Sequence, residues 1–193
     1  MKAQRYDAIM REIDRMPVGR IRLMEIGTCK GERAERMIEA AKRRRVPHLI
    51  EYYGFDLFEK PPARELSERT PPDDVKIVRA RLEKTGVGVS LYKGDTHVTL
   101  PENVLGLPVM DIIFIDGGHS TETIAADWEN VQPLVAEKTV IFFDDFWNYG
   151  EGGCNQVVAE IARTGHSVKV LDPPDRFRRP WGVLETKLVR VTL

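Results

Sequence analysis

The sequence is short of several features that would decide its class at once. Only two cysteines occur among its 193 residues, Cys29 and Cys154, and neither is part of a C-x-x-C pair. This excludes a disulfide framework and fits a reducing compartment. No apolar run approaches the roughly 20 residues needed to cross a bilayer, and the first residues are polar and charged rather than signal-like. We therefore expect a cytoplasmic protein with no membrane partner.

An excess of charge of one sign is also missing. The chain has 29 Lys and Arg against 30 Asp and Glu, a formal net charge of -1, so no basic footprint predicts a nucleic-acid partner. The cationic run at residues 42–45 is expected where a helix ends, and cations there complement the helix dipole. With 42% hydrophobic residues, a chain of this length predicts one domain over residues 1–193 with a sizeable core.

The apolar pattern alternates between the period of strands and the period of helices. Residues 21–26 predict a strand that runs into the turn 27–31, and Ala34, Met37 and Ile38 then recur at helical spacing. Further strands are expected at residues 49–55, 87–92, 112–115, 140–143, 167–171 and 181–193, further helices at 1–16, 73–84 with Asp73 as N-cap, 120–135 and around 157–161, and loops at 57–72 and 172–180. The alternation predicts a doubly wound, Rossmann-like α/β fold. Its seven-stranded sheet should be mostly parallel, with an antiparallel C-terminal strand and helices on both faces.

The turn at residues 27–31 is expected at the edge of the sheet where ligands bind. In an open α/β sheet, bare backbone N–H groups and a helix N-terminus meet at the carboxyl ends of the strands. Gly27 and Gly31 permit a positive φ or a close approach of a ligand to the main chain. However, the G-x-x-x-G turn lacks the dinucleotide signature G-x-G-x-x-G, and plain packing explains it at least as well.

Three of the predicted strands end in carboxylates. Asp56 follows the second, Asp116 the fourth, and Asp144 with Asp145 the fifth. Each of them alone could be a cap or a turn residue. Because all these strand ends are expected on the edge that holds the glycine turn, the side chains should converge, and crowded carboxylates repel one another unless a cation is present. Three carboxylates with water suit an octahedral Mg²⁺ ion.

His119 lies three residues beyond Asp116, at the mouth of the same edge. An imidazole can take a proton at neutral pH, and a neighbouring metal ion would acidify a bound hydroxyl. This combination suggests deprotonation of an alcohol. The alternative is that His119 caps the helix expected to begin at Ser120, and the residues leave both interpretations open.

Five motifs in order carry a family resemblance: Glu25-Ile26-Gly27-Thr28-Cys29-Lys30-Gly31, Gly54-Phe55-Asp56, Gly94-Asp95, Phe114-Ile115-Asp116-Gly117-Gly118-His119 and Phe143-Asp144-Asp145. In this order and spacing, over residues 23–158, the chain resembles class I S-adenosylmethionine-dependent methyltransferases. Within that class it is similar to small metal-dependent O-methyltransferases, the macrocin and mycinamicin sugar enzymes and, more distantly, the catechol type. The two final strands match the antiparallel end of that fold.

The resemblance implies the cofactor-binding residues Glu25, Gly27, Thr28, Gly31, Asp56, Asp95 and Asp116. Glu25 and Gly27 would hold the methionine end of S-adenosylmethionine. Asp56 would bind the ribose hydroxyls with its two oxygens, because a carboxylate suits a diol. Asp95 would lie near the adenine.

The resemblance also implies a catalytic centre. Asp116, Asp144 and Asp145 look like the ligands of Mg²⁺ or another divalent cation, and His119 takes the position of a general base, so that Asp116 and His119 are the expected catalytic residues. The implied reaction is methylation of a hydroxyl on a small-molecule acceptor, a sugar or a phenol. Homodimers are common in this group. The identity of the acceptor does not transfer, because residues 146–153 match nothing in the family.

Three other functions use part of the same pattern. Asp56 could hold the ribose of NAD in an oxidoreductase, although a Tyr-x-x-x-Lys pair is missing together with G-x-G-x-x-G. The acidic cluster could serve a metal-dependent hydrolase. A cofactor-binding module without catalysis is the third alternative, but such a module has no need of His119.

Overall fold

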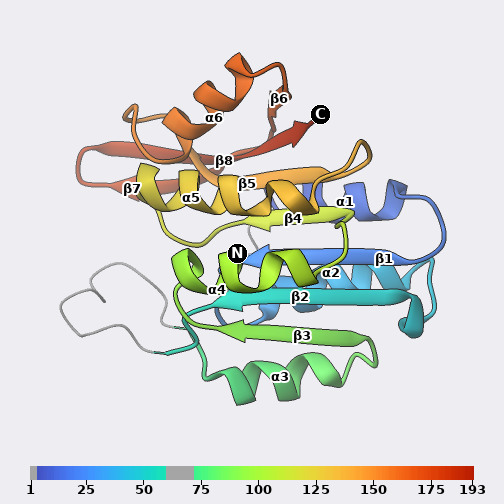
Figure 1. The fold of residues 1–193 in the computed structure, drawn as a ribbon. Coiled ribbons are helices and arrows are strands. Elements are labelled where there is room, and N and C mark those ends of the chain that lie inside the picture. Colours follow the sequence, from blue (N-terminus) through green and yellow to red (C-terminus); the bar gives the residue numbers. More distant parts are fainter. Residues whose placement is uncertain (1–3, 60–71) are drawn as a thin grey trace.

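The computed structural model describes residues 4–59 and 72–193 (Figure 1). Its strands are β1 (Ile21–Ile26), β2 (Ile50–Asp56), β3 (Gly88–Lys93), β4 (Ile112–Ile115), β5 (Val140–Trp147), β6 (Ser167–Val170), β7 (Asp175–Arg179) and β8 (Gly182–Thr192). Its α-helices are α1 (Asp7–Arg15), α2 (Glu32–Lys42), α3 (Val75–Glu83), α4 (Thr96–Asn103), α5 (Thr121–Val131) and α6 (Cys154–Arg163), and its 3-10 turns are η1 (Pro47–Leu49), η3 (Val104–Gly106) and η4 (Gln132–Leu134). No helix in these two ranges is long and apolar enough to span a membrane.

The strands form a single sheet in the order β3-β2-β1-β4-β5-β8-β6, with β7 paired to β8. Strands β1 to β5 are parallel to one another, and the arrowheads of β1 to β4 point to the same side of Figure 1. Strand β8 runs antiparallel between β5 and β6. The predicted Rossmann-like, mostly parallel sheet with an antiparallel C-terminal strand is confirmed.

The predicted count of seven strands omits β7, which lies in the segment expected to be a loop. The segment contains three prolines, at 173, 174 and 180, which are typical of a loop. The strand nevertheless pairs with the first half of β8, from Asp175 opposite Thr186 to Arg179 opposite Gly182. Its residues are mostly exposed, so backbone pairing rather than an apolar face holds β7 in place. No hydrophobic period could have revealed it.

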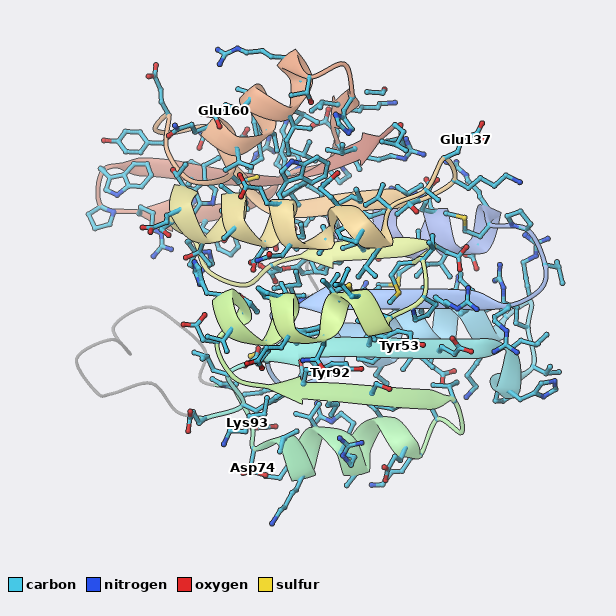
Figure 2. The ribbon with its side chains drawn as sticks, viewed as in Figure 1. Tyr53, Asp74, Tyr92, Lys93, Glu137 and Glu160 are labelled. Carbon is cyan, nitrogen blue, oxygen red and sulfur yellow. The ribbon has the colours of Figure 1, made fainter. Side chains whose placement is uncertain are left out.

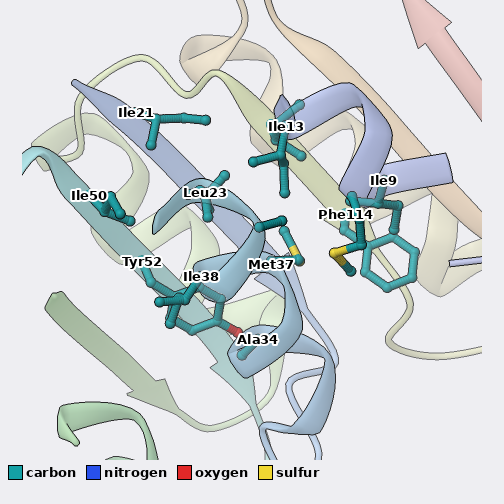
Figure 3. Close-up of a cluster of buried hydrophobic side chains, with 14 of the residues drawn as sticks. Ile9, Ile13, Ile21, Leu23, Ala34, Met37, Ile38, Ile50, Tyr52 and Phe114 are labelled. Carbon is teal, nitrogen blue, oxygen red and sulfur yellow. The ribbon is translucent and has the colours of Figure 1, made fainter. Parts of the chain in front are cut away.

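The helices cover both faces of the sheet, and alternate strand residues face each side. On one face, Phe114 of β4 and Phe142 of β5 join the first core cluster, packed by α1, α2 and α3. Figure 3 shows part of this cluster, including Ile9 of α1 and Ile38 of α2. On the opposite face, Ile115 and its neighbours join the second core cluster, packed by α4, α5 and α6. The continuous apolar runs of β4 and β5 follow from burial on both sides.

Three further expectations need correction. The N-cap of α3 is Asp74, labelled at the start of that helix in Figure 2, rather than Asp73. Asp74 Oδ1 accepts a hydrogen bond from Lys76 N at 2.8 Å. Helix α4 was not expected, because it contains Pro101 and buries only Leu100. Strand β5 continues through Asp144 and Asp145 to Trp147 instead of ending before the carboxylates. Most of the loop expected at residues 57–72 lies outside the described residues.

Candidate active site

The glycine turn between β1 and α2 is held between the two neighbouring strands. Gly27 N donates to Phe55 O of β2 at 2.8 Å, and Asp116 N, just after β4, donates to Ile26 O at 2.8 Å. Gly27 has φ +91°, and a Cβ atom there would lie 2.0 Å from Asp116 O. Gly31, with φ +74°, begins α2. The turn therefore brings the backbone to the carboxyl edge, as expected of a ligand site.

The two carboxylates expected to contact the nucleoside lie at the ends of β2 and β3. Asp56 is beside the turn, and its Oδ2 accepts from Cys29 N at 2.8 Å while its Oδ1 accepts from Phe58 N at 2.9 Å. Asp95 is the N-cap of α4, with its Oδ1 2.9 Å from His97 N and its side chain 62% exposed. Asp56 is thus fixed next to the glycine turn, and Asp95 lies one strand further out in the sheet.

Glu25 is fully buried in β1, and Arg33 contacts both its carboxylate and the backbone of the glycine turn. Its oxygens accept from Tyr52 Oη at 2.5 Å and from Arg33 Nε at 3.1 Å. Burial raises the pKa of Glu25, and the charge of Arg33 opposes this rise. Arg33, in the first turn of α2, also donates to Gly27 O at 2.9 Å. Thr28, buried in the turn, has its hydroxyl 3.3 Å from Tyr52 Oη.

Asp116 and Asp144 face the same side of the sheet, the side covered by α1 and α2. Asp116 is paired with Arg33 at 2.5 Å. Asp144 accepts hydrogen bonds from Arg5 Nε at 2.8 Å and Arg5 Nη2 at 2.9 Å, and from Tyr6 Oη at 2.6 Å. Burial raises the pKa of the Tyr6 hydroxyl, and the charge of Asp144 raises it further, so Tyr6 remains a donor. Sequence reasoning missed Arg5 and Arg33, because no local pattern marks a partner so distant along the chain.

Asp145 faces the opposite side and is paired with His119. A bulge interrupts the pairing of β5 with β8 between Phe143 and Phe146, and Asp145 there has φ +59°. Its Oδ2 is 2.6 Å from His119 Nδ1. Burial alone would raise the pKa of Asp145, but the hydrogen bond and charge of His119 lower it below the ordinary value. Bulges often re-aim side chains at functional sites.

The start of α5 shows which residue caps the helix. Ser120 Oγ accepts from Thr123 N at 3.1 Å and is the N-cap. Ser120, and not His119, is therefore the cap of this helix. The imidazole instead lies between Asp145 and Trp147, with the ring centroids of His119 and Trp147 6.4 Å apart.

The residues expected to bind Mg²⁺ do not fit the ion as they are arranged. Within residues 4–59 and 72–193, no group of three or more His, Cys, Asp or Glu side chains is placed to hold a metal ion. Asp144 projects from β5 toward α1, Asp145 projects toward His119, and Asp116 is engaged by Arg33. Each of the three carboxylates has its own basic partner, although Asp116 lies near enough to Asp144 and Asp145 that, after burial, their charges also raise its pKa.

Asp127 of α5 is a buried carboxylate that sequence reasoning also missed. It lies beneath Gly117, where an added Cβ would be 3.3 Å from Asp127 Oδ2. In the part of the chain that the structure describes, neither carboxylate oxygen has a partner at full hydrogen-bond geometry, although the Thr96 hydroxyl lies near enough to oppose the rise in the pKa of Asp127. Burial raises the pKa of Asp127 to about 6. The sequence position carried no signal, because Asp127 lies between ordinary helix residues.

We expect Asp127→Asn to change how stability depends on pH. Since the pKa of Asp127 is about 6 in the folded chain and 3.8 ordinarily, the folded state binds the proton more tightly. The stabilisation from the neutral form is complete below about pH 4 and is lost as pH rises through about 6, a loss of about 3 kcal/mol. The variant should therefore unfold at higher urea concentration than the wild type near pH 8, and the difference should shrink toward pH 4. A difference that is constant with pH would refute this assignment.

Taken together, the sheet order, the glycine turn after β1 and the acidic ends of the next strands define the Rossmann-like fold of methyltransferases. The sequence matches the family described as "Methyltransferase domain" over residues 24–146, more than half of the chain. The chain belongs to this family. No curated protein matches the sequence significantly.

Solved structures with the same fold include enzymes with different acceptors. The O-methyltransferase NovP superposes with a TM-score of 0.65 and 16% identity, covering 98% of this chain and 80% of that one. An O-methyltransferase from Bacillus cereus in complex with SAH gives 0.60 and 15%, covering 97% and 78%. An rRNA methylase from Streptococcus thermophilus gives 0.61 and 9%, covering 100% and 98%. At these identities the likeness shows the fold, and the acceptor has to be argued from the site.

Proposed function

We propose that the protein transfers the methyl group of S-adenosylmethionine to a hydroxyl group of a small-molecule acceptor. The observation that carries this proposal is the pair formed by His119 Nδ1 and Asp145 Oδ2, 2.6 Å apart. His119 follows β4 and Asp145 lies on β5, toward the carboxyl edge of the sheet where the glycine turn follows β1. A methyl transfer from a sulfonium needs little more from the protein than alignment and a base for the acceptor proton.

The cofactor is placed by the turn after β1. Gly27 lets the end of β4 pack directly against the turn, since an added Cβ would lie 2.0 Å from Asp116 O, and the cofactor is expected to bind along this turn. Glu25 and Asp116 both pair with Arg33, so the ammonium group of S-adenosylmethionine would share these carboxylates with the guanidinium. Asp56, at the end of β2, suits the ribose diol. The SAH complex of the Bacillus cereus enzyme supports the choice of this cofactor.

His119 acts as the general base in this proposal. Because Nδ1 is held by Asp145, the proton of the acceptor hydroxyl passes to Nε2. The oxygen then attacks the methyl carbon, the C–O bond forms as the C–S bond breaks, and S-adenosylhomocysteine leaves. Asp145 fixes the orientation of the ring and stabilises the imidazolium, as the carboxylate does in a Ser-His-Asp triad. The imidazole is 37% exposed, so an acceptor can reach it.

Aromatic side chains on and after β5 suit an acceptor that presents a ring face, such as a phenol or a sugar. Trp147 is nearest to His119, and Tyr149 stacks on Trp181 with ring centroids 4.9 Å apart. Tyr149 and Trp181 are 67% and 56% exposed. Exposed stacked rings offer an apolar face to a ligand at little cost in side-chain entropy.

Calorimetry and product analysis would test this function. We expect the purified chain to bind S-adenosylmethionine and S-adenosylhomocysteine but not NAD. With methyl-labelled cofactor, label should pass to phenols or sugars and should not pass to the matching amines. Binding of NAD alone would favour the oxidoreductase instead. Transfer to amines only would refute O-methylation while leaving the methyltransferase family intact. The cytoplasmic location and the homodimer stay predictions.

A further inference from the structure

We infer that Arg5 takes the place of the divalent cation at the acidic edge, so that methyl transfer by this chain needs no metal ion. This inference rests on the proposed function. It departs from the expectation, drawn from the resemblance, that Asp116, Asp144 and Asp145 hold Mg²⁺.

The first argument is that Asp144 has no acceptor capacity left. A carboxylate offers about four lone-pair positions. Oδ1 accepts from Arg5 Nε at 2.8 Å and from Asp145 N at 2.8 Å, and Oδ2 accepts from Arg5 Nη2 at 2.9 Å and from Tyr6 Oη at 2.6 Å. The fork-to-fork geometry with Arg5 is the strong, bidentate type. A metal ion could bind Asp144 only after displacing these donors.

The second argument is that Arg5 is itself fixed. Its side chain is 9% exposed, and its remaining nitrogen pairs with Asp175 of β7. Gln4 N donates to the other oxygen of Asp175 at 3.0 Å. The guanidinium also lies over the ring of Tyr6, with its carbon 4.5 Å from the centroid. The strand that the sequence did not reveal, β7, thus anchors the cation.

The third argument concerns charge. On the side of the sheet covered by α1 and α2, Arg33 pairs with both Asp116 and Glu25. Arg5 pairs with both Asp144 and Asp175. These two guanidinium groups already bring positive charge between the carboxylates, which lowers the repulsion that a metal ion would otherwise have to offset. Asp145 lies on the other side and holds His119. The crowding that predicted a metal ion is therefore relieved by the protein itself.

The decisive test is metal binding by the folded wild-type chain. After treatment with EDTA, titration with Mn²⁺ or Mg²⁺ should give no saturable heat, and S-adenosylhomocysteine should bind equally well in EDTA and in Mg²⁺. Turnover should likewise be unchanged by EDTA. Saturable binding of one ion per chain, or turnover lost in EDTA and restored by Mg²⁺, would overturn the inference. Failure of the proposed function would appear separately, as absence of cofactor binding in every buffer.

Arg5→Met tests whether Arg5 is the group that keeps a metal ion from binding Asp144. Removing the guanidinium frees Asp144, so the variant should gain Mn²⁺ binding, measured by calorimetry, that the wild type lacks. A folded Arg5→Met chain that binds no Mn²⁺ would contradict the role of Arg5. The matched control is Asp175→Asn, which weakens the anchor of Arg5 but leaves the four donors on Asp144, and it should bind no metal. Should Arg5→Met fail to fold, the wild-type titration still decides the inference.

Discussion

Gly27→Ala is expected to abolish measurable binding of S-adenosylmethionine and to destabilise the fold by about 2–5 kcal/mol. Two effects combine. At φ +91° an L-residue is strained, and its Cβ would lie 2.0 Å from Asp116 O and 2.5 Å from Asp116 C. Because these are backbone atoms at the end of β4, the clash cannot be relieved by rotating a side chain. The turn or the strand must move, and the cofactor site with it. Calorimetry with S-adenosylhomocysteine and urea denaturation measure the two effects.

Gly165→Ala is the matched control for this prediction. Gly165 has φ +92°, nearly the same as Gly27, but no atom lies within 4 Å of its added Cβ. It follows α6 and precedes β6, outside the candidate site. Only the backbone strain remains, so a loss of about 1–2 kcal/mol in stability with unchanged cofactor affinity is expected. If both variants bound S-adenosylhomocysteine as the wild type does, the turn would not be the cofactor site.

The sheet was predictable from the sequence because strands buried on both faces appear as continuous apolar runs. The runs Ile112–Ile115 and residues 140–143 can only be central strands, and glycine followed by helical spacing defined the turn and α2. Helix α4 and strand β7 show no such pattern, since α4 buries only Leu100 and β7 is mostly exposed. Their positions depend on pairing with parts of the chain that become neighbours only in the folded state.

The sequence predicted which carboxylates follow the strand ends, but not which side chains they pair with. The alternation of side chains along a strand could have separated Asp144 from Asp145, because Phe142 and Asp144 share one face of β5 and Phe143 and Asp145 share the other. What no local pattern contains is Arg5, which is 139 positions before its partner. A cluster of carboxylates predicts a cation, and the fold supplies one from the N-terminal segment.

His119→Gln is expected to lower kcat by about 10²–10⁴-fold while leaving the affinity for S-adenosylhomocysteine unchanged. Glutamine keeps a polar side chain of similar reach but cannot take a proton from the acceptor. No contact joins His119 to Glu25, Gly27 or Asp56 among the described residues, so the cofactor site should keep its geometry. Turnover with labelled cofactor and calorimetry measure the two quantities. His166→Gln is the control, since His166 lies before β6 and contacts Trp128, and its kcat should match the wild type.

Asp145→Asn tests whether His119 needs the carboxylate of Asp145 in order to act as the base. The amide oxygen of the substituted side chain could still accept from His119 Nδ1, but without the negative charge it would stabilise the imidazolium less, so kcat should fall by less than in His119→Gln. The double variant should be no slower than His119→Gln, because Asp145 acts only through the imidazole. Multiplicative losses in the double variant would show that Asp145 contributes by another route. Full activity of His119→Gln would remove the imidazole from the mechanism, and the acceptor would then have to lose its proton to water or arrive ionised.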